Sequence, residues 1–218
     1  MDIAKLSLEF VKVIAWPVVV LVAVLVFRKE LATLISRLRN MKLPGGTEFN
    51  FNEAVISIEK SSRETSRALK PPSSRQPLAF RQRVNSFIQE KKLMVSQSGY
   101  DLAYYLDIAQ SDPNLALAGI RMELERMFRN MLVLVGEDVD KKRLSAGQYL
   151  SLLRSREMIP ASMYQFLAQT IEVGNAAVHV SDIEKDLSLR VINSLKVFVT
   201  FYLDWIQSNF INKKGKRG

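Results

Sequence analysis

Two residues that could take part in acid–base or polar chemistry, Asn175 and His179, lie close together in the sequence. His179 is the single histidine of 218 residues, and Asn175 precedes it by four positions. Residues four apart share one face of a helix, one turn from each other. An imidazole can move a proton near neutral pH, and an amide can orient a ligand. Gly174 has no side chain and permits close approach of a neighbouring helix or ligand.

Three interpretations of Asn175 and His179 stay open. They can be a polar pair that fixes helix packing, or they can contact a nucleotide or RNA without catalysis. In the third interpretation they are catalytic residues of RNA cleavage, a role implied only by the family resemblance that residues 100–207 carry. That reaction without a metal needs a group that moves the 2′-hydroxyl proton and a cation beside the phosphate.

The composition excludes several other kinds of chemistry. The chain contains no cysteine, which excludes disulfides, thiolate zinc sites, iron–sulfur clusters and cysteine nucleophiles. A single histidine excludes a histidine-cluster metal site, and the carboxylates show no spacing typical of a metal or glycosidase site. The sequence therefore predicts neither a metal site nor a cofactor.

The elements that position these residues are predicted to be helices from Leu78 onward. Asp112-Pro113 is a helix start, and Ser145 with Gln148 and Ser181 with Glu184 have the spacing of capping boxes. No alternation of strands and helices is present, so the sequence predicts an all-α bundle over residues 78–210. The predicted helices cover 78–97, 100–110, 113–136, 145–156, a segment that begins at Pro160, and a last one of about six turns through Trp205.

The most apolar stretch lies near the N-terminus, from Leu6 to Phe27, and no charged residue falls between Val13 and Phe27. A helix of roughly 20 apolar residues crosses a bilayer, so residues 1–27 are predicted to be a single transmembrane helix. Arg28-Lys29 follow at once and no Ala-x-Ala site is present, which argues against a cleaved signal peptide. A buried core helix is the other alternative.

Residues 28–43 are predicted to form a basic amphipathic helix after the span. Its apolar stripe suits packing on a surface, and the basic side suits anionic lipid headgroups; packing against a second copy is the alternative. The excess of basic residues after the span predicts an external N-terminus and a cytoplasmic C-terminal domain, in a single-pass bacterial inner-membrane protein. The residues predicted to lie on the membrane surface are Arg28, Lys29, Arg37, Arg39 and Lys42.

Residues 44–77 are predicted to form a short hook and a linker. Pro44-Gly45-Gly46 ends the preceding helix, and Phe49 and Phe51 alternate with polar residues as in a short strand or an extended hook. A helix could begin at Val55, Ile56 and Ile58. From Lys60 to Pro77 the composition is mostly Ser, Arg, Lys, Glu and Pro, which is typical of a spacer.

The order of helices and one short motif resemble a known family. A long helix with Arg121, Glu125 and Arg129 is followed by a helix that ends in Gly174-Asn175-x-x-x-His179 and by an acidic start to a final helix. This pattern, over roughly 100–207, resembles the HEPN superfamily. More narrowly, it is similar to the HEPN-like domain of unknown function found in bacterial conflict and phage-defence proteins.

The resemblance implies site residues and a partner. HEPN ribonucleases use an Arg-x4-6-His motif, whose histidine corresponds to His179. The arginine is missing, because Asn175 stands nearest its place and no arginine lies between Arg156 and His179. Arg121 or Arg129 would then supply the cation or contact RNA. The resemblance also implies a homodimer or higher homo-oligomer.

We therefore expect a membrane-anchored, HEPN-like protein that acts by protein or nucleic-acid interaction in phage defence or stress response. Its expected partners are the lipid bilayer, a second copy and a protein encoded nearby, with RNA or a nucleotide as a weaker expectation. The alternative is a membrane-tethered, metal-independent ribonuclease toxin that uses His179. A third hypothesis is a regulator of a neighbouring membrane complex.

The net charge of +9 favours a membrane surface over RNA. Residues 28–42 contribute +4, and the basic tail at 211–218 contributes a further +4. Residues 76–140 carry −2. A nucleic-acid-binding domain is expected to show a concentrated basic face, and the charge of the predicted bundle does not indicate one.

Overall fold

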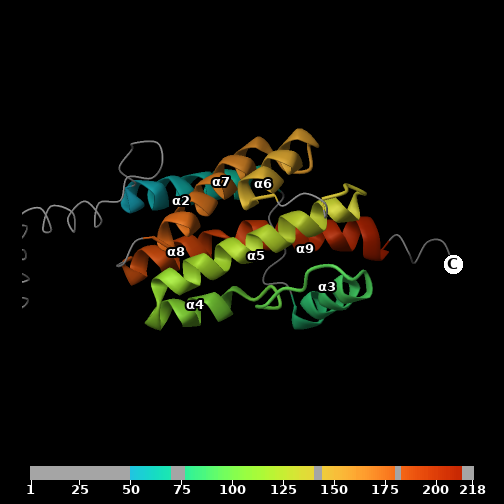
Figure 1. Ribbon diagram of the computed structural model, residues 1–218, viewed down its shortest axis with the longest axis horizontal. Helices are drawn as coiled ribbons and strands as arrows, with labels where there is room; N and C mark the ends of the chain where they lie inside the picture. Colours follow the sequence, from blue (N-terminus) through green and yellow to red (C-terminus); the bar gives the residue numbers. More distant parts are fainter. Residues whose placement is uncertain (1–49, 70–76, 140–143, 180–182, 213–218) are drawn as a thin grey trace, which may run out of the picture. The chain divides into compact units, whose positions relative to one another are not determined.

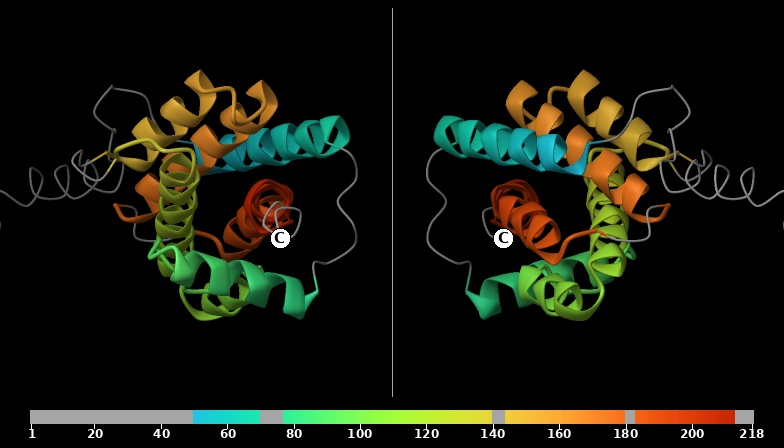
Figure 2. Two further views of the ribbon diagram at one scale, coloured as in Figure 1. Left: turned by 90° about the vertical axis from the view of Figure 1, so that its right-hand side faces the viewer. Right: turned by 90° about the vertical axis from the view of Figure 1, so that its left-hand side faces the viewer.

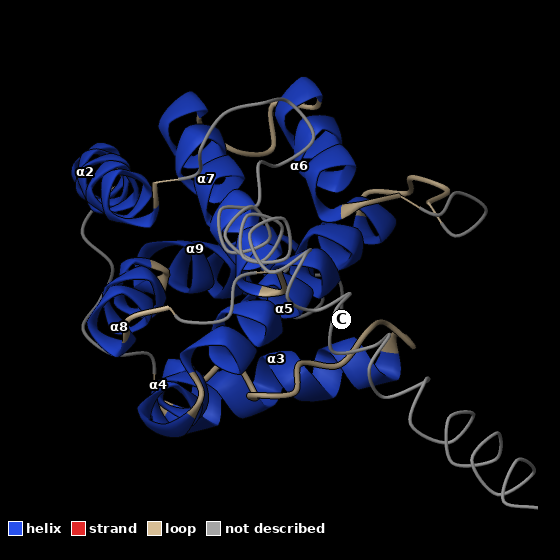
Figure 3. Cartoon of the chain, turned by 60° about the vertical axis from the view of Figure 1, so that its left-hand side comes forward, coloured by secondary structure: helices blue, strands red, loops and turns tan. Residues whose placement is uncertain are grey.

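The computed structural model describes residues 50–69, 77–139, 144–179 and 183–212, and each regular element in these ranges is a helix (Figures 1 and 3). These residues belong to the compact unit Phe49–Gly218. The prediction of an all-α fold is confirmed for this part of the chain. Its elements are α2 (Phe51–Ala68), α3 (Leu78–Glu90), α4 (Leu102–Ser111), α5 (Pro113–Leu134), α6 (Ala146–Ser155), α7 (Ala161–Ala177), α8 (Lys185–Ser194), α9 (Lys196–Ile206) and the π-helix η1 (Gln207–Ile211).

Local sequence signals place most helix starts correctly. The Asp112 side chain accepts a hydrogen bond from the Leu115 amide at 2.8 Å, and Pro113 opens α5. Ser145 and Gln148 form the predicted capping box at the start of α6. Helix ends are less well predicted. The helix predicted over residues 78–97 ends at Glu90 as α3, and residues 91–101 form an irregular segment.

Helix α5 is the central element of the unit. It packs against α4, α6, α7 and α8, and Figure 1 shows it crossing the bundle between them. Its buried apolar side chains recur every three or four residues, as expected for a helix that buries one broad stripe. They include Leu117, Ile120, Leu124, Met127, Phe128 and Met131.

The prediction of a hook and linker over residues 44–77 is wrong for α2. Phe51 lies in a helix of 18 residues, which packs along α7 and α8 and buries Val55, Ile58, Ser62 and Thr65. The reason is that small polar residues at helical spacing extend the buried face that the apolar residues begin. The helical unit therefore begins before residue 78.

Polar side chains attach α2 to the bundle at three places. Gln169 of α7 donates to the Ser57 hydroxyl at 2.7 Å, and Arg190 of α8 forms a bidentate pair with Glu59 at 3.0 Å. This pairing, mainly through its hydrogen bonds, lowers the pKa of Glu59. The third contact comes from Ser62, which bonds to the backbone at the break between α8 and α9.

The last predicted helix is divided at Leu195 into α8 and α9. The Leu195 amide bonds to the Ile192 carbonyl, only three residues back, which tightens the turn. The carbonyl of Ser194 accepts a hydrogen bond of 2.8 Å from the Ser62 hydroxyl of α2. A tertiary contact thus accompanies a break that the continuous apolar stripe does not predict. Glu184, predicted in the first turn, is the N-cap residue of α8, and Ser181, predicted as the cap, lies outside the described residues.

Helix α3 lies against the C-terminal end of the described chain. Figure 2 shows α9 between α2 and α3, and both helices contact it. The rings of Phe87 and Phe210 are 6.2 Å apart, which brings α3 against η1. Arg81 also forms an ion pair of 2.7 Å with Asp101, the N-cap residue of α4.

The predicted membrane segments fall outside the described residues. In the four described ranges, no helix combines the length and the apolar character that a membrane crossing requires. The predicted span at 1–27 and the basic helix at 28–43 lie within residues 1–49, and most of the predicted basic tail lies at 213–218. Ile211, predicted as its first residue, belongs to η1.

Candidate functional site

The Asn175 and His179 pair lies at the end of α7. The helix ends at Ala177, so His179 follows it in a turn, where its amide bonds to the Ala176 carbonyl at 2.9 Å. The prediction that both residues lie within one helix is therefore wrong by two residues. His179 is exposed and Asn175 is half-buried. Neither side chain has a hydrogen-bond partner within the described part of the chain.

Gly174 permits the close contact between α5 and α7, as the sequence indicates. A Cβ atom at this position would lie 2.8 Å from the Arg121 Cβ and 3.2 Å from the Leu117 carbonyl oxygen. Both neighbours are fixed by the α5 backbone, so only a glycine lets the two helices approach this far. Of the two roles that the sequence allows for Gly174, the structure shows the approach of a neighbouring helix.

Asn114, near the start of α5, fixes the end of α7 on the bundle. Its side chain donates to the Ala177 carbonyl at 2.8 Å and accepts from the Ile183 amide at 3.3 Å. It thereby joins the end of α7 to the approach to α8 and holds both sides of the segment that contains His179. Sequence reasoning missed Asn114, because an asparagine in the first turn of a helix usually serves only local capping.

The contacts also place the two arginines relative to His179. Gly174 meets Leu117 and Arg121, whereas Ala177 meets Asn114, so α5 and α7 run antiparallel. At about 1.5 Å per residue, Arg121 lies roughly 10 Å along α5 from Asn114, and Arg129 lies roughly 22 Å along it. The end of α7 that carries His179 is thus far from Arg129.

Arg121 is engaged within its own helix. Its guanidinium lies 3.8 Å from the Glu125 carboxylate, the i,i+4 pair expected from the sequence, and its side chain is 30% exposed. Its Nε is buried and has no hydrogen-bond partner among the described residues. Within the same residues, no group of three or more acidic or histidine side chains could hold a metal ion.

A second polar site lies inside the bundle, on the face of α5 that meets the irregular segment 91–101. Its centre is Glu123, whose side chain is 4% exposed. One oxygen, Oε2, accepts from the Tyr105 hydroxyl at 3.1 Å and from the backbone amide of Gln97 at 3.3 Å. It also lies 3.4 Å from Nη1 of Arg126. The other, Oε1, is buried and has no hydrogen-bond partner among the described residues.

Asn130 continues this polar site two turns further along α5. The side-chain Nδ2 of Asn130 donates to the Met94 backbone carbonyl at 2.8 Å, and its Oδ1 accepts from the Met94 backbone amide at 3.0 Å. The side chain thus satisfies both backbone groups of Met94. It also lies 3.5 Å from the Tyr202 hydroxyl, which is 3.5 Å from that of Tyr100. We call Glu123, Asn130, Tyr100, Tyr105 and Tyr202 the buried polar cluster.

Burial changes the acidity of the tyrosines in this cluster. It raises the pKa of Tyr202 to about 12, although hydrogen bonds with Tyr100 and Asn130 act in the opposite direction. Burial also raises the pKa values of Tyr100 and Tyr105, with further contributions from Tyr202 and Glu123 respectively. All three hydroxyls therefore remain protonated near neutral pH.

The sequence did contain a signal for this cluster. Glu123 and Asn130 are seven residues apart, on the helical face that also carries Ile120, Met127 and Met131. A carboxylate and an amide on a buried stripe are expected to have hydrogen-bond partners. The position of Glu123 and Asn130 on the apolar stripe, and not their residue types, is therefore the signal that indicates a buried polar cluster.

The outer face of α5 exposes apolar side chains. Leu115 is 58% exposed and Met122 is 45% exposed, and their spacing of seven puts them on one face. Val178, at the adjoining end of α7, is 63% exposed. We call Leu115, Met122 and Val178 the apolar surface.

The described residues define a helical bundle whose apolar core contains the buried polar cluster and whose surface exposes apolar side chains on α5 and at the end of α7. Comparison of the chain with models of protein families, with curated proteins and with solved structures finds no match in any of the three. The resemblance to HEPN-like domains therefore stays a prediction from the motif and the order of helices.

Proposed function

We propose that this chain is a membrane-anchored bacterial protein whose helical unit acts by binding another protein, with a second copy as its first partner. A role in phage defence or stress response is the setting that the HEPN-like resemblance implies. The observation that supports binding most directly is the apolar surface on α5 and the end of α7.

The arrangement of polar groups favours binding over catalysis. The buried polar cluster is enclosed, and its hydrogen bonds connect α5 with segment 91–101. His179 is exposed but stands apart from Arg129, while Arg121 is paired with Glu125. Neither of the two arginines that the resemblance implies is therefore a favourable cation for cleavage at His179.

A second copy is the favoured partner because of the predicted anchor. Two chains confined to one membrane meet at a raised effective concentration, so a small interface is enough to pair them. Leu115, Met122 and Val178 are large apolar groups whose burial would stabilise such a pair. A protein encoded nearby is the other candidate for the same surface.

Charged substitutions test the proposal. The variant Leu115→Lys/Met122→Lys should weaken self-association of the detergent-solubilised full chain by about ten-fold or more, because it places charges in an apolar contact. Light scattering and in-membrane cross-linking measure the change. The matched control is Ile56→Lys on α2, which is 59% exposed and outside this surface. Equal association of both variants and the wild type would contradict the proposal.

The alternative of a membrane-tethered ribonuclease has one supporting observation, the exposed imidazole of His179. In this alternative the phosphate belongs to the bound RNA, and the cation beside it would be a group other than Arg129, for example one from a second copy. RNA cleavage by the wild type that is lost in His179→Ala would favour this alternative.

A further inference from the structure

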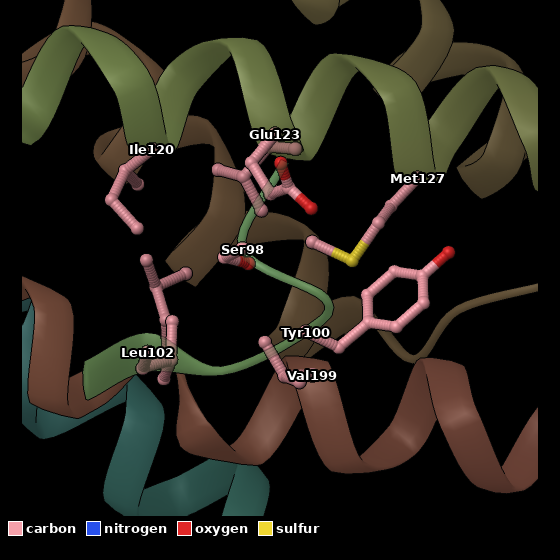
Figure 4. Close-up of a pocket in the computed structure, with 9 residues that line it drawn as sticks. Ser98, Tyr100, Leu102, Ile120, Glu123, Met127 and Val199 are labelled. Carbon is pink, nitrogen blue, oxygen red and sulfur yellow. The ribbon is translucent and has the colours of Figure 1, made fainter. Parts of the chain in front are cut away.

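The carboxylate of Glu123 borders a small internal cavity. The cavity lies between α5, the segment after Ser96 and the start of α9, and it has a volume of about 10 Å³. Figure 4 shows the Glu123 carboxylate directed from α5 toward the side chains that face it. Apart from Glu123 and Ser98, the lining is almost wholly apolar, with Ile120, Met127 and Val199 among its residues.

We propose that this cavity is a binding site for a single water molecule, which donates to Glu123 Oε1 and accepts from the Ser98 hydroxyl. One water needs on the order of 10 Å³ of such space, about the volume of one probe sphere. The volume of the cavity therefore matches one water and excludes a larger ligand. A buried water usually makes two to four hydrogen bonds, and the lining supplies one acceptor and one donor.

The hydrogen bonds around Ser98 leave its proton available. The Ser96 hydroxyl accepts from the Tyr100 amide at 3.0 Å and lies 3.2 Å from the Ser98 hydroxyl. Because the Ser96 oxygen already accepts one bond, its own hydrogen can be donated to Ser98. Ser98 can then donate its hydrogen to the water, so that each group in the chain from Tyr100 to Glu123 has a partner.

The site explains how a carboxylate is retained in this interior. Oε2 already has the Tyr105 hydroxyl and the Gln97 amide as donors, whereas Oε1 is buried without a partner among the described residues. Burial of an acceptor without a hydrogen-bond partner destabilises the folded state. A bound water offsets this cost and connects α5 to Ser98.

The direct test is a crystal structure of the full chain at a resolution that shows ordered water. We expect one water peak within hydrogen-bond distance of Glu123 Oε1 and Ser98 Oγ. A cavity without such a peak, or with Oε1 hydrogen-bonded directly to a protein group, would overturn the proposal. This measurement uses the wild type and does not depend on the folding of any variant.

A double-mutant cycle gives a second test in solution. Ser98→Ala and Glu123→Gln should be coupled by about five-fold in the unfolding equilibrium constant, although no direct hydrogen bond joins the two side chains. The control cycle combines Glu123→Gln with Ser111→Ala, because the Ser111 hydroxyl bonds to the Ile108 carbonyl of its own helix and does not line the cavity. Equal coupling in the two cycles would count against the water bridge.

Discussion

The two polar regions of this bundle differ in what surrounds them. The buried polar cluster is enclosed by α4, α5, α9 and segment 91–101, and Tyr105, Asn130 and Tyr202 are each at most 1% exposed. The Asn175 and His179 pair lies at the end of α7, and its histidine is exposed. The buried polar cluster contains no histidine. The second region contains His179, the residue whose type alone would suggest acid–base catalysis.

The difference shows that residue type and environment give separate information. A tyrosine becomes a weaker acid when burial removes it from water, because desolvation disfavours its charged form. The clearest physical consequence here is the raised pKa of the three tyrosines. Stability should therefore depend strongly on the side chains of the first region. At the end of α7 it should depend on the helix contact at Gly174 and very little on the side chain of His179. Four measurements test that contrast.

Asn130→Leu should have the largest effect. The change keeps the size of the side chain but leaves the amide and carbonyl of Met94 without their partner. The expected cost is about 2–3 kcal/mol in the free energy of unfolding, measured by urea unfolding of the detergent-solubilised chain. The control is Asn193→Leu, at an exposed position of α8. It should cost no more than about 0.5 kcal/mol. Equal losses in both variants would remove the distinction between the buried and exposed positions.

Gly174→Ala tests what the end of α7 contributes through packing alone. The added Cβ would stand 2.8 Å from the Arg121 Cβ and would force α5 and α7 apart. The net cost should be about 2 kcal/mol in the free energy of unfolding. Gly147→Ala in α6 is the matched control, because its Cβ would meet nothing within 4 Å. That variant should be stabilised by about 0.5–1 kcal/mol through helix propensity. A Gly174→Ala chain as stable as the wild type would show that the helices can separate at little cost.

The tyrosines predict a loss of stability at alkaline pH. A tyrosine with a pKa of about 12 in the folded chain and 10 when unfolded keeps its proton longer in the folded state. Its contribution to stability is therefore complete below pH 10 and is lost as the pH rises toward 12. At pH 11, Tyr202 alone should reduce the free energy of unfolding by roughly 1 kcal/mol.

Comparison with Tyr202→Phe isolates this effect. The variant has no ionisable group at that position, so its stability should fall less between pH 9 and pH 11 than that of the wild type. Denaturant unfolding monitored by circular dichroism at each pH gives the slopes. Tyr100 and Tyr105 still contribute in the variant, so a smaller slope is expected instead of a flat one. Identical slopes would show that Tyr202 is not desolvated.

The sequence predicted the helical class and most helix starts because these depend on local signals. The Asp112-Pro113 start and the Ser145 capping box are examples. It failed where tertiary contacts decide the structure. Helix α2 looked like a spacer because Ser62 and Thr65 are polar, yet both are buried against the bundle. The break at Leu195 accompanies the bond from Ser62 to Ser194, which lies 132 residues away in the chain.

The sequence predicted which residues lie near each other at the candidate site but not their surroundings. Spacing alone placed His179 and Asn175 near each other, and the missing side chain of Gly174 indicated that a neighbouring helix can approach closely. Whether Arg121 or Arg129 reaches the histidine depends on the antiparallel packing of α5 and α7, which no local pattern encodes. Glu123 lies on the apolar stripe of its helix, which is a sequence signal, but its hydrogen bonds with Tyr105 and the Gln97 backbone depend on tertiary packing that no local pattern encodes.

His179→Ala should have the smallest effect on stability, because the imidazole is exposed and has no hydrogen-bond partner among the described residues. The expected change is no more than about 0.5 kcal/mol in the free energy of unfolding. The same variant decides between binding and RNA cleavage. If the proposed binding function holds, wild type and variant should affect growth equally and leave cellular RNA intact. RNA fragments that form only with the wild type would instead assign catalysis to His179. Since the substitution leaves folding unchanged, such a result would show that the exposed region acts through chemistry and the buried cluster through stability.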